Sequence, residues 1–191
     1  MAGTKIKRGE CIIISLFTMQ EIIMSKDFQC DKHWRNQIEL CLHIAVEAHH
    51  GQVDKVGLPV ILHPLEVAKM GETPMEVCVG FLHDTIEDTD ITAEALLNAG
   101  VDSEIVECVK LLTHDKTISY NDYVQSIIDS DNPVAISVKY NDLTHNAQRA
   151  ETYGFDKQLQ KCVHAMEKIR VSSLASSLSW SKAKAKRYIL S

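Results

Sequence analysis

The chain contains 191 residues, has a formal net charge of −6, and is 45% hydrophobic and 6% aromatic. This length fits one compact domain with additional residues at its ends. The negative charge argues against nonspecific nucleic-acid binding, which requires clustered Lys and Arg side chains. The scarcity of aromatic residues favours helices over a β-sandwich.

Residues 1–31 are predicted to form an N-terminal extension. Within them, residues 11–24 are apolar, but the segment is too short to span a membrane and is interrupted by Gln20 and Glu21. Basic residues precede it, as in a signal peptide, but no small-residue cleavage site follows. We expect either a loosely attached amphipathic helix or an extension that adds little to function, and no membrane partner.

Six cysteines are scattered along the chain, and none forms a C-x-x-C pair. Several lie within apolar helical patterns, which predicts buried, reduced thiols in a cytoplasmic protein. Disulfides or a zinc knuckle are the alternatives.

Helical patterns recur throughout residues 32–175, and no run alternates with period two for long enough to require a sheet. Capping and breaking residues set the boundaries, as in the Thr73–Glu76 capping box with Pro74 at the first helical position. The predicted helices cover 32–49, a segment beginning at Pro64, 74–87, 92–100, 102–112, 119–128, a segment that begins at 132–133 and carries Asp142, and 156–172. The sequence therefore predicts an all-α helical bundle over 32–175, followed by a basic helix or tail over 176–191.

The most informative local pattern is FLHDTIED at residues 81–88, where an apolar helix carries a cluster of charged groups near its end. His83 and Glu87 are four residues apart, as are Asp84 and Asp88, so each pair shares a helix face. Burying three carboxylates this close together costs several kcal/mol each unless a cation compensates. A divalent metal is the simplest way to stabilise such a cluster.

The alternative is a solvated helix end. We interpret the second His-Asp pair, His114–Asp115, as helix-end or loop residues, because no acidic turn follows it. Two distant positions favour a metal at the first pair. His63 lies at a loop-to-helix junction, where a rigidly held ring can point into a cleft, and Asp142 interrupts an apolar helix. Taken alone, His63 would be a capping or surface histidine, and Asp142 would be a residue on the polar face of its helix.

The order of His63, His83–Asp84 and Asp142 resembles the HD-domain superfamily of metal phosphohydrolases. More closely, four segments resemble the hydrolase domain of Rel/Spo-type guanosine tetraphosphate hydrolases: AHHGQ (48–52), ILHPLEVA (61–68), FLHDTIEDT (81–89) and VKYNDLTHN (138–146). The resemblance covers residues 33–170. It implies an HD-domain helical bundle that acts as a stand-alone hydrolase without a synthetase domain.

By this resemblance, the metal ligands are His63, His83, Asp84 and Asp142. Two imidazoles and two carboxylates suit Mn²⁺, our first choice, or Fe²⁺, with Zn²⁺ and Mg²⁺ as alternatives. The resemblance also places Glu87 and Asp88 beside the attacking water. Glu87 would be the water-positioning group or general base, with Asp88 supporting it. Charge balance around the metal is the alternative role for this pair.

Lys55, Lys139 and Asn146 are the candidate substrate contacts, with Lys55 reaching a phosphate and Asn146 a ribose. The family usually carries Arg-Lys at positions 54–55, and this Arg helps to hold the guanine base. Here the first residue is Asp54, which cannot stack or donate in the same way. A second family Arg is replaced by Leu143.

The predicted function is metal-dependent hydrolysis of a nucleotide phosphate ester, with guanosine 3′-diphosphates as the first substrates to test. An HD-type nucleotidase or another small-nucleotide phosphohydrolase is the alternative enzyme. A non-catalytic nucleotide-binding sensor and a helical scaffold that uses the basic tail are alternatives of other classes. The expected partner is a small nucleotide, not a nucleic acid, and a homo-oligomer is left open.

Overall fold

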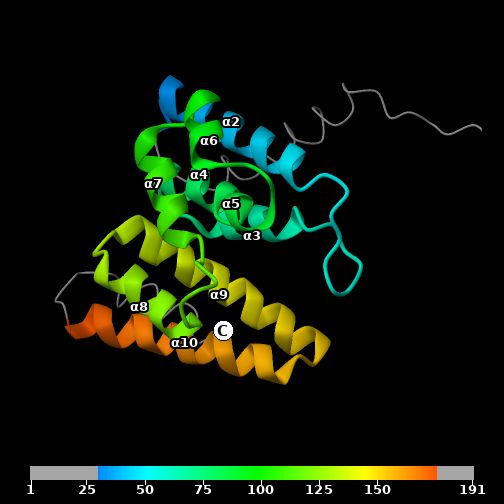
Figure 1. Cartoon of the computed structure of the whole chain (residues 1–191), viewed down its shortest axis with the longest axis vertical. Helices are drawn as coiled ribbons and strands as arrows, with labels where there is room; N and C mark the ends of the chain where they lie inside the picture. Colours follow the sequence, from blue (N-terminus) through cyan, green and yellow to red (C-terminus); the bar gives the residue numbers. More distant parts are fainter. Residues whose placement is uncertain (1–29, 176–191) are drawn as a thin grey trace, which may run out of the picture.

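The computed structural model describes residues 30–175, where the regular secondary structure is helical apart from one isolated β-bridge between Val53 and Pro59 (Figure 1). The predicted all-α bundle is confirmed. The helices are α2 (Lys32–Ala48), α3 (Leu62–Met70), α4 (Pro74–Leu82), α5 (Thr85–Asp88), α6 (Ala93–Asn98), α7 (Ser103–Leu112), α8 (Tyr120–Asp129), α9 (Pro133–Tyr153) and α10 (Asp156–Ala175). None of these helices has both the length and the apolar character needed to cross a membrane.

The predictions for the N-terminal extension and for the basic C-terminal tail mostly concern residues outside 30–175. Most of the N-terminal extension, including the apolar segment 11–24, and the basic tail 176–191 lie outside the described residues. Of the cysteines within the described range, none is in a disulfide, and four are buried as predicted: Cys41, Cys78, Cys108 and Cys162.

Side-chain caps begin several helices where the sequence predicts them. The hydroxyl of Thr73 accepts a hydrogen bond from the backbone N–H of Glu76 at 3.2 Å, and Thr92 and Ser119 cap α6 and α8 in the same way. At the start of α9, the side chain of Asn132 accepts two backbone N–H groups. These contacts satisfy N–H groups that a helix start otherwise leaves unpaired.

Two helix starts differ from the prediction. Helix α3 begins at Leu62 and not at Pro64, because the N–H groups of Leu62 and His63 bond to preceding loop carbonyls and complete a turn ahead of the proline. Helix α7 begins after Asp102 without the predicted side-chain cap. The carboxylate of Asp102 instead contacts His33 Nε2 of α2 at 2.8 Å.

The helix predicted to run to about Glu87 is in fact two helices. Helix α4 ends at Leu82, and the short helix α5 begins at Thr85. The break occurs because the backbone at Asp84, with ψ of −7°, leaves the regular helical path. His83 and Asp84 therefore lie at a corner of the chain, and Glu87 lies on a separate turn.

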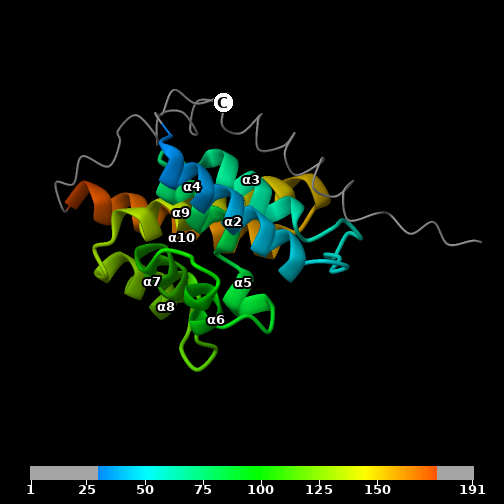
Figure 2. The same cartoon turned by 90° about the horizontal axis from the view of Figure 1, so that it is seen from above.

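Helix α4 is the centre of the bundle. All of its residues from Val77 to Leu82 are buried, and it packs against α2, α3, α7 and α9 (Figures 1 and 2). A helix that is apolar on every side is expected in such a position. Helix α10 runs alongside α9 in both views, and its apolar residues complete the core. The corner at the end of α4 is thus held between α3 and α9.

Helices α3 and α4 approach each other closely at Gly80. A Cβ atom added there would lie 2.7 Å from the Cα of Ala68 and 2.9 Å from its backbone nitrogen. Because these are backbone atoms, no side-chain rotation can relieve the contact. The glycine therefore sets the separation between the two helices.

We predict that Gly80→Ala lowers the free energy of unfolding by about 3 kcal/mol, the upper end of the usual range for overpacking. Urea denaturation measures the change. Gly57→Ala is the control, since a Cβ there meets nothing within 4 Å and only the φ of +82° opposes it. Its cost should be about 1 kcal/mol. Equal stability of the two variants would contradict the close approach.

Candidate metal centre

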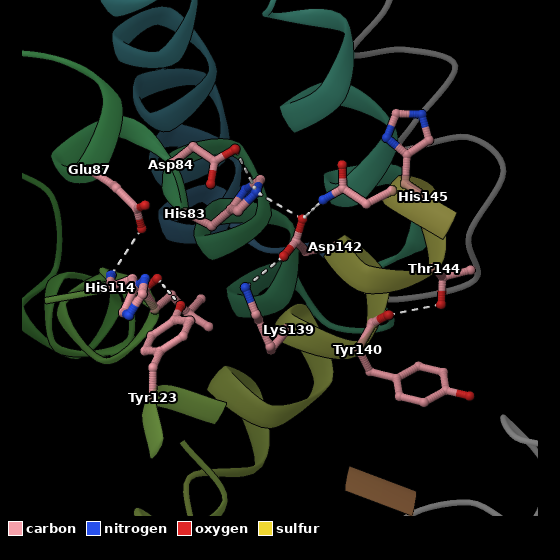
Figure 3. Close-up of polar contacts among 12 residues, drawn as sticks. His83, Asp84, Glu87, His114, Tyr123, Lys139, Tyr140, Asp142, Thr144 and His145 are labelled. Atoms are coloured by element: carbon pink, nitrogen blue, oxygen red, sulfur yellow. Dashed lines mark hydrogen bonds and ion pairs between the residues drawn. The ribbon is translucent and has the colours of Figure 1, made fainter. Parts of the chain in front are cut away.

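Four side chains from three helical regions converge at the end of α4, and Figure 3 shows three of them, His83, Asp84 and Asp142. The Nε2 atom of His63, on α3, lies 3.0 Å from Oδ1 of Asp142, on α9, and 3.2 Å from Nε2 of His83. Oδ2 of Asp84 lies 3.1 Å from His83 Nε2 and 3.5 Å from His63 Nε2. The structure therefore brings together all four sequence-predicted ligands.

The orientation of the His83 ring is fixed by a contact with its own helix. Its Nδ1 lies 2.8 Å from the carbonyl oxygen of Gly80. A carbonyl oxygen only accepts, so Nδ1 carries a hydrogen, and in the neutral ring Nε2 directs its lone pair at the cluster. This is the tautomer that metal ligation through Nε2 requires.

The Asp142 carboxylate is oriented by two neighbours on its own helix. Lys139 Nζ donates to Oδ2 at 2.8 Å, and Asn146 Nδ2 donates to Oδ1 at 2.5 Å. These residues lie three positions before and four positions after Asp142, on the same helix face. Both were predicted as substrate contacts. The structure places them on the Asp142 carboxylate, and contact with a substrate stays a prediction.

A further histidine, His145, lies against His63. Their Nδ1 atoms are 2.7 Å apart, and the two rings stack with centroids 5.0 Å apart. Burial and the nearby His63 lower the pKa of His145 to about 4, which favours a neutral ring. His145 was not among the residues predicted from the sequence, although its position three residues after Asp142 could have indicated it.

The electrostatics of the cluster favour positive charge at its centre. Burial alone would lower the pKa of His83, but the carboxylates of Asp84 and Asp142 outweigh it and raise this pKa to about 9. Burial alone would raise the pKa of Asp84, but His83 and His63 lower it to about 2. The pKa of Asp142 is also held well below its usual value, because Lys139 and the imidazoles outweigh burial.

This donor set fits a divalent cation. One ligand atom each from His63, His83 and Asp142 lie within 4.8 Å of one another, and all three residues are buried. Asp84 adds a fourth oxygen next to both imidazoles. Nitrogen and oxygen donors in this combination suit Mn²⁺, Fe²⁺ and Zn²⁺. The predicted divalent metal is thus supported by the residues present, while the choice of Mn²⁺ stays a prediction.

The carboxylate of Glu87 contacts the loop between α7 and α8, and its predicted role beside the attacking water stays a prediction. Its Oε2 accepts the backbone N–H of His114 at 2.9 Å, and its other carboxylate oxygen pairs with Lys116 Nζ. Figure 3 shows the carboxylate turned toward His114. The expectation that His83 and Glu87 share one face of a continuous helix is wrong, because the chain turns at Asp84.

Asp88 is exposed at the end of α5. Partial burial of its carboxyl group and the neighbouring carboxylates of Asp84 and Glu87 raise its pKa above the usual value. A carboxylate with a raised pKa is a stronger proton acceptor. Asp88 is therefore suited to the supporting acid–base role predicted for it, which stays a prediction.

The second His-Asp pair lies in the loop between α7 and α8, as predicted. Asp115 accepts the backbone N–H of Thr117 at 2.9 Å. His114 stacks on Tyr123 of α8, with ring centroids 4.6 Å apart. Neither side chain belongs to the four-ligand cluster.

Lys55 is exposed in the loop over 53–59. Its neighbour Asp54 turns inward, accepts two backbone N–H groups of the same loop at 2.9 Å each, and forms an ion pair with Arg149 of α9. The loop is thereby tied to the helix that carries Asp142. The sequence reasoning did not identify Arg149, which is 95 residues from its partner.

Aromatic and basic side chains border the cluster on the side of α8 and α10. Lys139 Nζ lies 5.0 Å from the centre of the Tyr123 ring, and Lys161 Nζ lies 3.5 Å from that of Tyr120. Partial burial and repulsion from Lys139 lower the pKa of Lys161. The two lysines together place positive charge on this side of the cluster, which favours anions.

Comparison with known proteins places this site in context. No protein-family model matches the chain. A GTP pyrophosphokinase of Streptomyces coelicolor is 29% identical over 161 residues, which are 76% of this chain and 18% of that protein. The guanosine-3′,5′-bis(diphosphate) 3′-pyrophosphohydrolase of Aquifex aeolicus is 29% identical over 141 residues, which are 69% of this chain and 20% of that protein.

The chain is related to the Rel/Spo-type proteins. This confirms the resemblance found in its sequence, although the chain spans only about a fifth of the length of these curated relatives. The fold agrees with a solved structure of a metazoan SpoT orthologue described as hydrolysing ppGpp. The similarity covers 74% of this chain and 96% of that one, with a TM-score of 0.52 and 17% sequence identity.

We predict that the two His-Asp pairs differ sharply in metal binding. His83→Ala should weaken Mn²⁺ binding by more than about 100-fold, because loss of residues that only orient ligands already costs about 10–100-fold. Titration calorimetry with MnCl₂ measures the affinity. His114→Ala is the matched control and should bind as the unchanged chain does. Equal affinities for the two variants would rule out the assigned ligand set.

We also predict that Arg149→Ala loosens the loop over 53–59, because Asp54 then loses its only ion pair described here. Amide hydrogen exchange at Val56 and Leu58, whose N–H groups bond to Asp54, should become several-fold faster. Lys55→Ala is the control. Unchanged amide hydrogen exchange in Arg149→Ala would show that the loop keeps its conformation without the ion pair to α9.

Proposed function

We propose that this chain is a metal-dependent phosphohydrolase that removes pyrophosphate from the 3′ position of guanosine tetraphosphate. The observation that carries the proposal is the convergence of His63, His83, Asp84 and Asp142 on one small volume. The relative from Aquifex aeolicus is named as a 3′-pyrophosphohydrolase, and the structural neighbour is described as hydrolysing ppGpp. These two names support hydrolysis, whereas the relative from Streptomyces coelicolor is named a GTP pyrophosphokinase, so the four-residue cluster is what favours hydrolysis here.

The reaction adds water across one phosphoester bond. The water oxygen bonds to the phosphorus next to the 3′ oxygen, the bond between that phosphorus and the 3′ oxygen breaks, and the 3′ oxygen takes up a proton. Pyrophosphate and GDP are the products. When bound, a divalent metal would polarise a phosphoryl oxygen and lower the pKa of water.

The protein groups near the cluster have separate tasks in this proposal. Glu87, held by the His114 N–H and by Lys116, presents a fixed carboxylate that can orient water. Asp88, with its raised pKa, is the nearby proton acceptor. Lys139 balances the charge of the site beside Asp142. Together they would position water and take up its proton.

The basic and aromatic border gives the substrate its orientation. Lys161, which forms no ion pair among the described residues, lies over Tyr120 and can attract phosphate oxygens. Its positive charge is close enough to that of Lys139 to lower its pKa. A substrate with two separate phosphate groups can therefore place one at the cluster and the other toward α10.

The decisive experiment is to incubate the chain, loaded with Mn²⁺, with guanosine tetraphosphate and identify the products by ³¹P NMR and anion-exchange chromatography. We expect pyrophosphate and GDP. Asp142→Ala should abolish turnover, whereas Asp115→Ala should not. Incubation with ATP and GTP tests the opposite activity, and formation of guanosine tetraphosphate there would refute the proposal.

A broader nucleotidase is the second candidate, and Asp54 favours it. Asp54 stands where the sequence resemblance places a guanine-holding Arg, and its carboxylate is engaged with Arg149. Release of inorganic phosphate from several nucleoside monophosphates, with guanosine tetraphosphate left intact, would select this candidate. Tight nucleotide binding without turnover in the presence of Mn²⁺ would instead indicate a sensor.

We predict that Glu87→Gln lowers kcat by about 10²–10⁴-fold, the usual contribution of a group that orients or deprotonates the nucleophile. The variant keeps the size of the side chain and an acceptor for the His114 N–H. Asp90→Asn, an exposed change nearby, is the control. Steady-state kinetics at saturating Mn²⁺ gives both values. An unaltered kcat in Glu87→Gln would remove this residue from the mechanism.

A further inference from the structure

A buried histidine outside the metal cluster is linked to the Glu87–Asp88 turn. His49, the residue that ends α2, is 2% exposed. Its Nδ1 lies 2.9 Å from Oε1 of Gln52, and Nε2 of Gln52 donates to the backbone carbonyl of Asp88 at 3.2 Å. The contacts connect the end of α2 to the end of α5, which lie near each other in Figure 2.

The pattern of donors fixes the tautomer of His49. Because the amide nitrogen of Gln52 donates to Asp88, its oxygen faces His49 and accepts. Nδ1 of His49 therefore carries the hydrogen, and Nε2 of the neutral ring is an acceptor. This Nε2 is buried and has no hydrogen-bond partner among the residues that the structure describes.

A buried polar atom without a partner reduces stability, so packing alone does not explain an imidazole here. An apolar side chain of similar size would fill the same space without that cost. The ring instead serves the link, because its Nδ1 hydrogen holds the Gln52 amide in the orientation that donates to Asp88.

We propose that His49 and Gln52 are positioning residues, which hold the Glu87–Asp88 turn at the edge of the metal cluster. The catalytic part of this inference rests on the proposed hydrolase function. The geometric part does not, because the link between α2 and α5 exists whatever the reaction is. Neither residue touches the four metal ligands in the described contacts.

The test compares four variants. His49→Leu removes both ring nitrogens, and Gln52→Glu keeps the oxygen that faces His49 but loses the donor to Asp88. His49→Asn keeps a donor in the place of Nδ1. His50→Leu, at the exposed neighbouring histidine, is the matched control.

Two readouts separate this inference from the proposed function. The first is exchange of the Asp88 amide hydrogen, which bonds to the Asp84 carbonyl at 2.9 Å. We expect exchange about tenfold faster in His49→Leu and Gln52→Glu, near-normal exchange in His49→Asn, and no change in His50→Leu. The second is kinetics, where kcat should fall about tenfold in the first two variants while KM stays within about twofold.

The outcomes are distinct. If the unchanged chain hydrolyses no nucleotide, the proposed function fails, and the exchange data still decide whether His49 and Gln52 hold the turn. Normal exchange and normal kcat in Gln52→Glu would overturn the inference, even if His49→Leu fails to fold. Faster exchange in His50→Leu as well would also overturn it, because the effect would then not depend on the Gln52 link.

Discussion

The fold and the proposed chemistry both depend on one electrostatic constraint, the packing of two carboxylates against two buried imidazoles. His63 Nε2 is 3.0 Å from Asp142 Oδ1, and His83 Nε2 is 3.1 Å from Asp84 Oδ2. Carboxylates this close repel each other and lose hydration unless positive charge lies between them. A proton on an imidazole supplies some of this charge, as the raised pKa of His83 shows, and a divalent ion supplies more. The cluster is therefore stable only in a form that is ready for a cation.

One residue, Gly80, determines both how the helices pack around the cluster and how one of its ligands is oriented. Gly80 lets α4 approach the backbone of Ala68 on α3, and this approach fixes where His63 lies relative to His83. The carbonyl of the same glycine accepts the Nδ1 hydrogen of His83 and so directs Nε2 inward. A side chain at this position would disturb both the distance between the helices and the ligand His83, which follows three residues later. The stability of the core and the geometry of the site are thus linked at one backbone position.

Much of this could be predicted from the sequence, because local rules govern it. Capping residues such as Thr73 and Asn132 indicated helix starts, and the four ligand positions follow from residue types in a recognisable order. What could not be predicted depends on long-range contacts. The pairing of Asp54 with Arg149 spans 95 residues, and that of His63 with His145 spans 82. The break at Asp84 was also missed, since nothing in the local pattern distinguishes a corner from a continuing helix.

That break has a consequence for how the acidic residues can act. In one continuous helix, Glu87 would follow His83 rigidly, and the four carboxyl and imidazole groups would move as one body. The short helix α5 is instead held from two other directions. The loop after α7 holds Glu87 through Lys116 and the His114 N–H, while the loop after α2 holds the Asp88 backbone through Gln52. The ligands and the acid–base residues are therefore positioned by different parts of the fold. Relatives with the same ligands could differ in turnover through changes in the loop after α2 or in the α7–α8 loop alone.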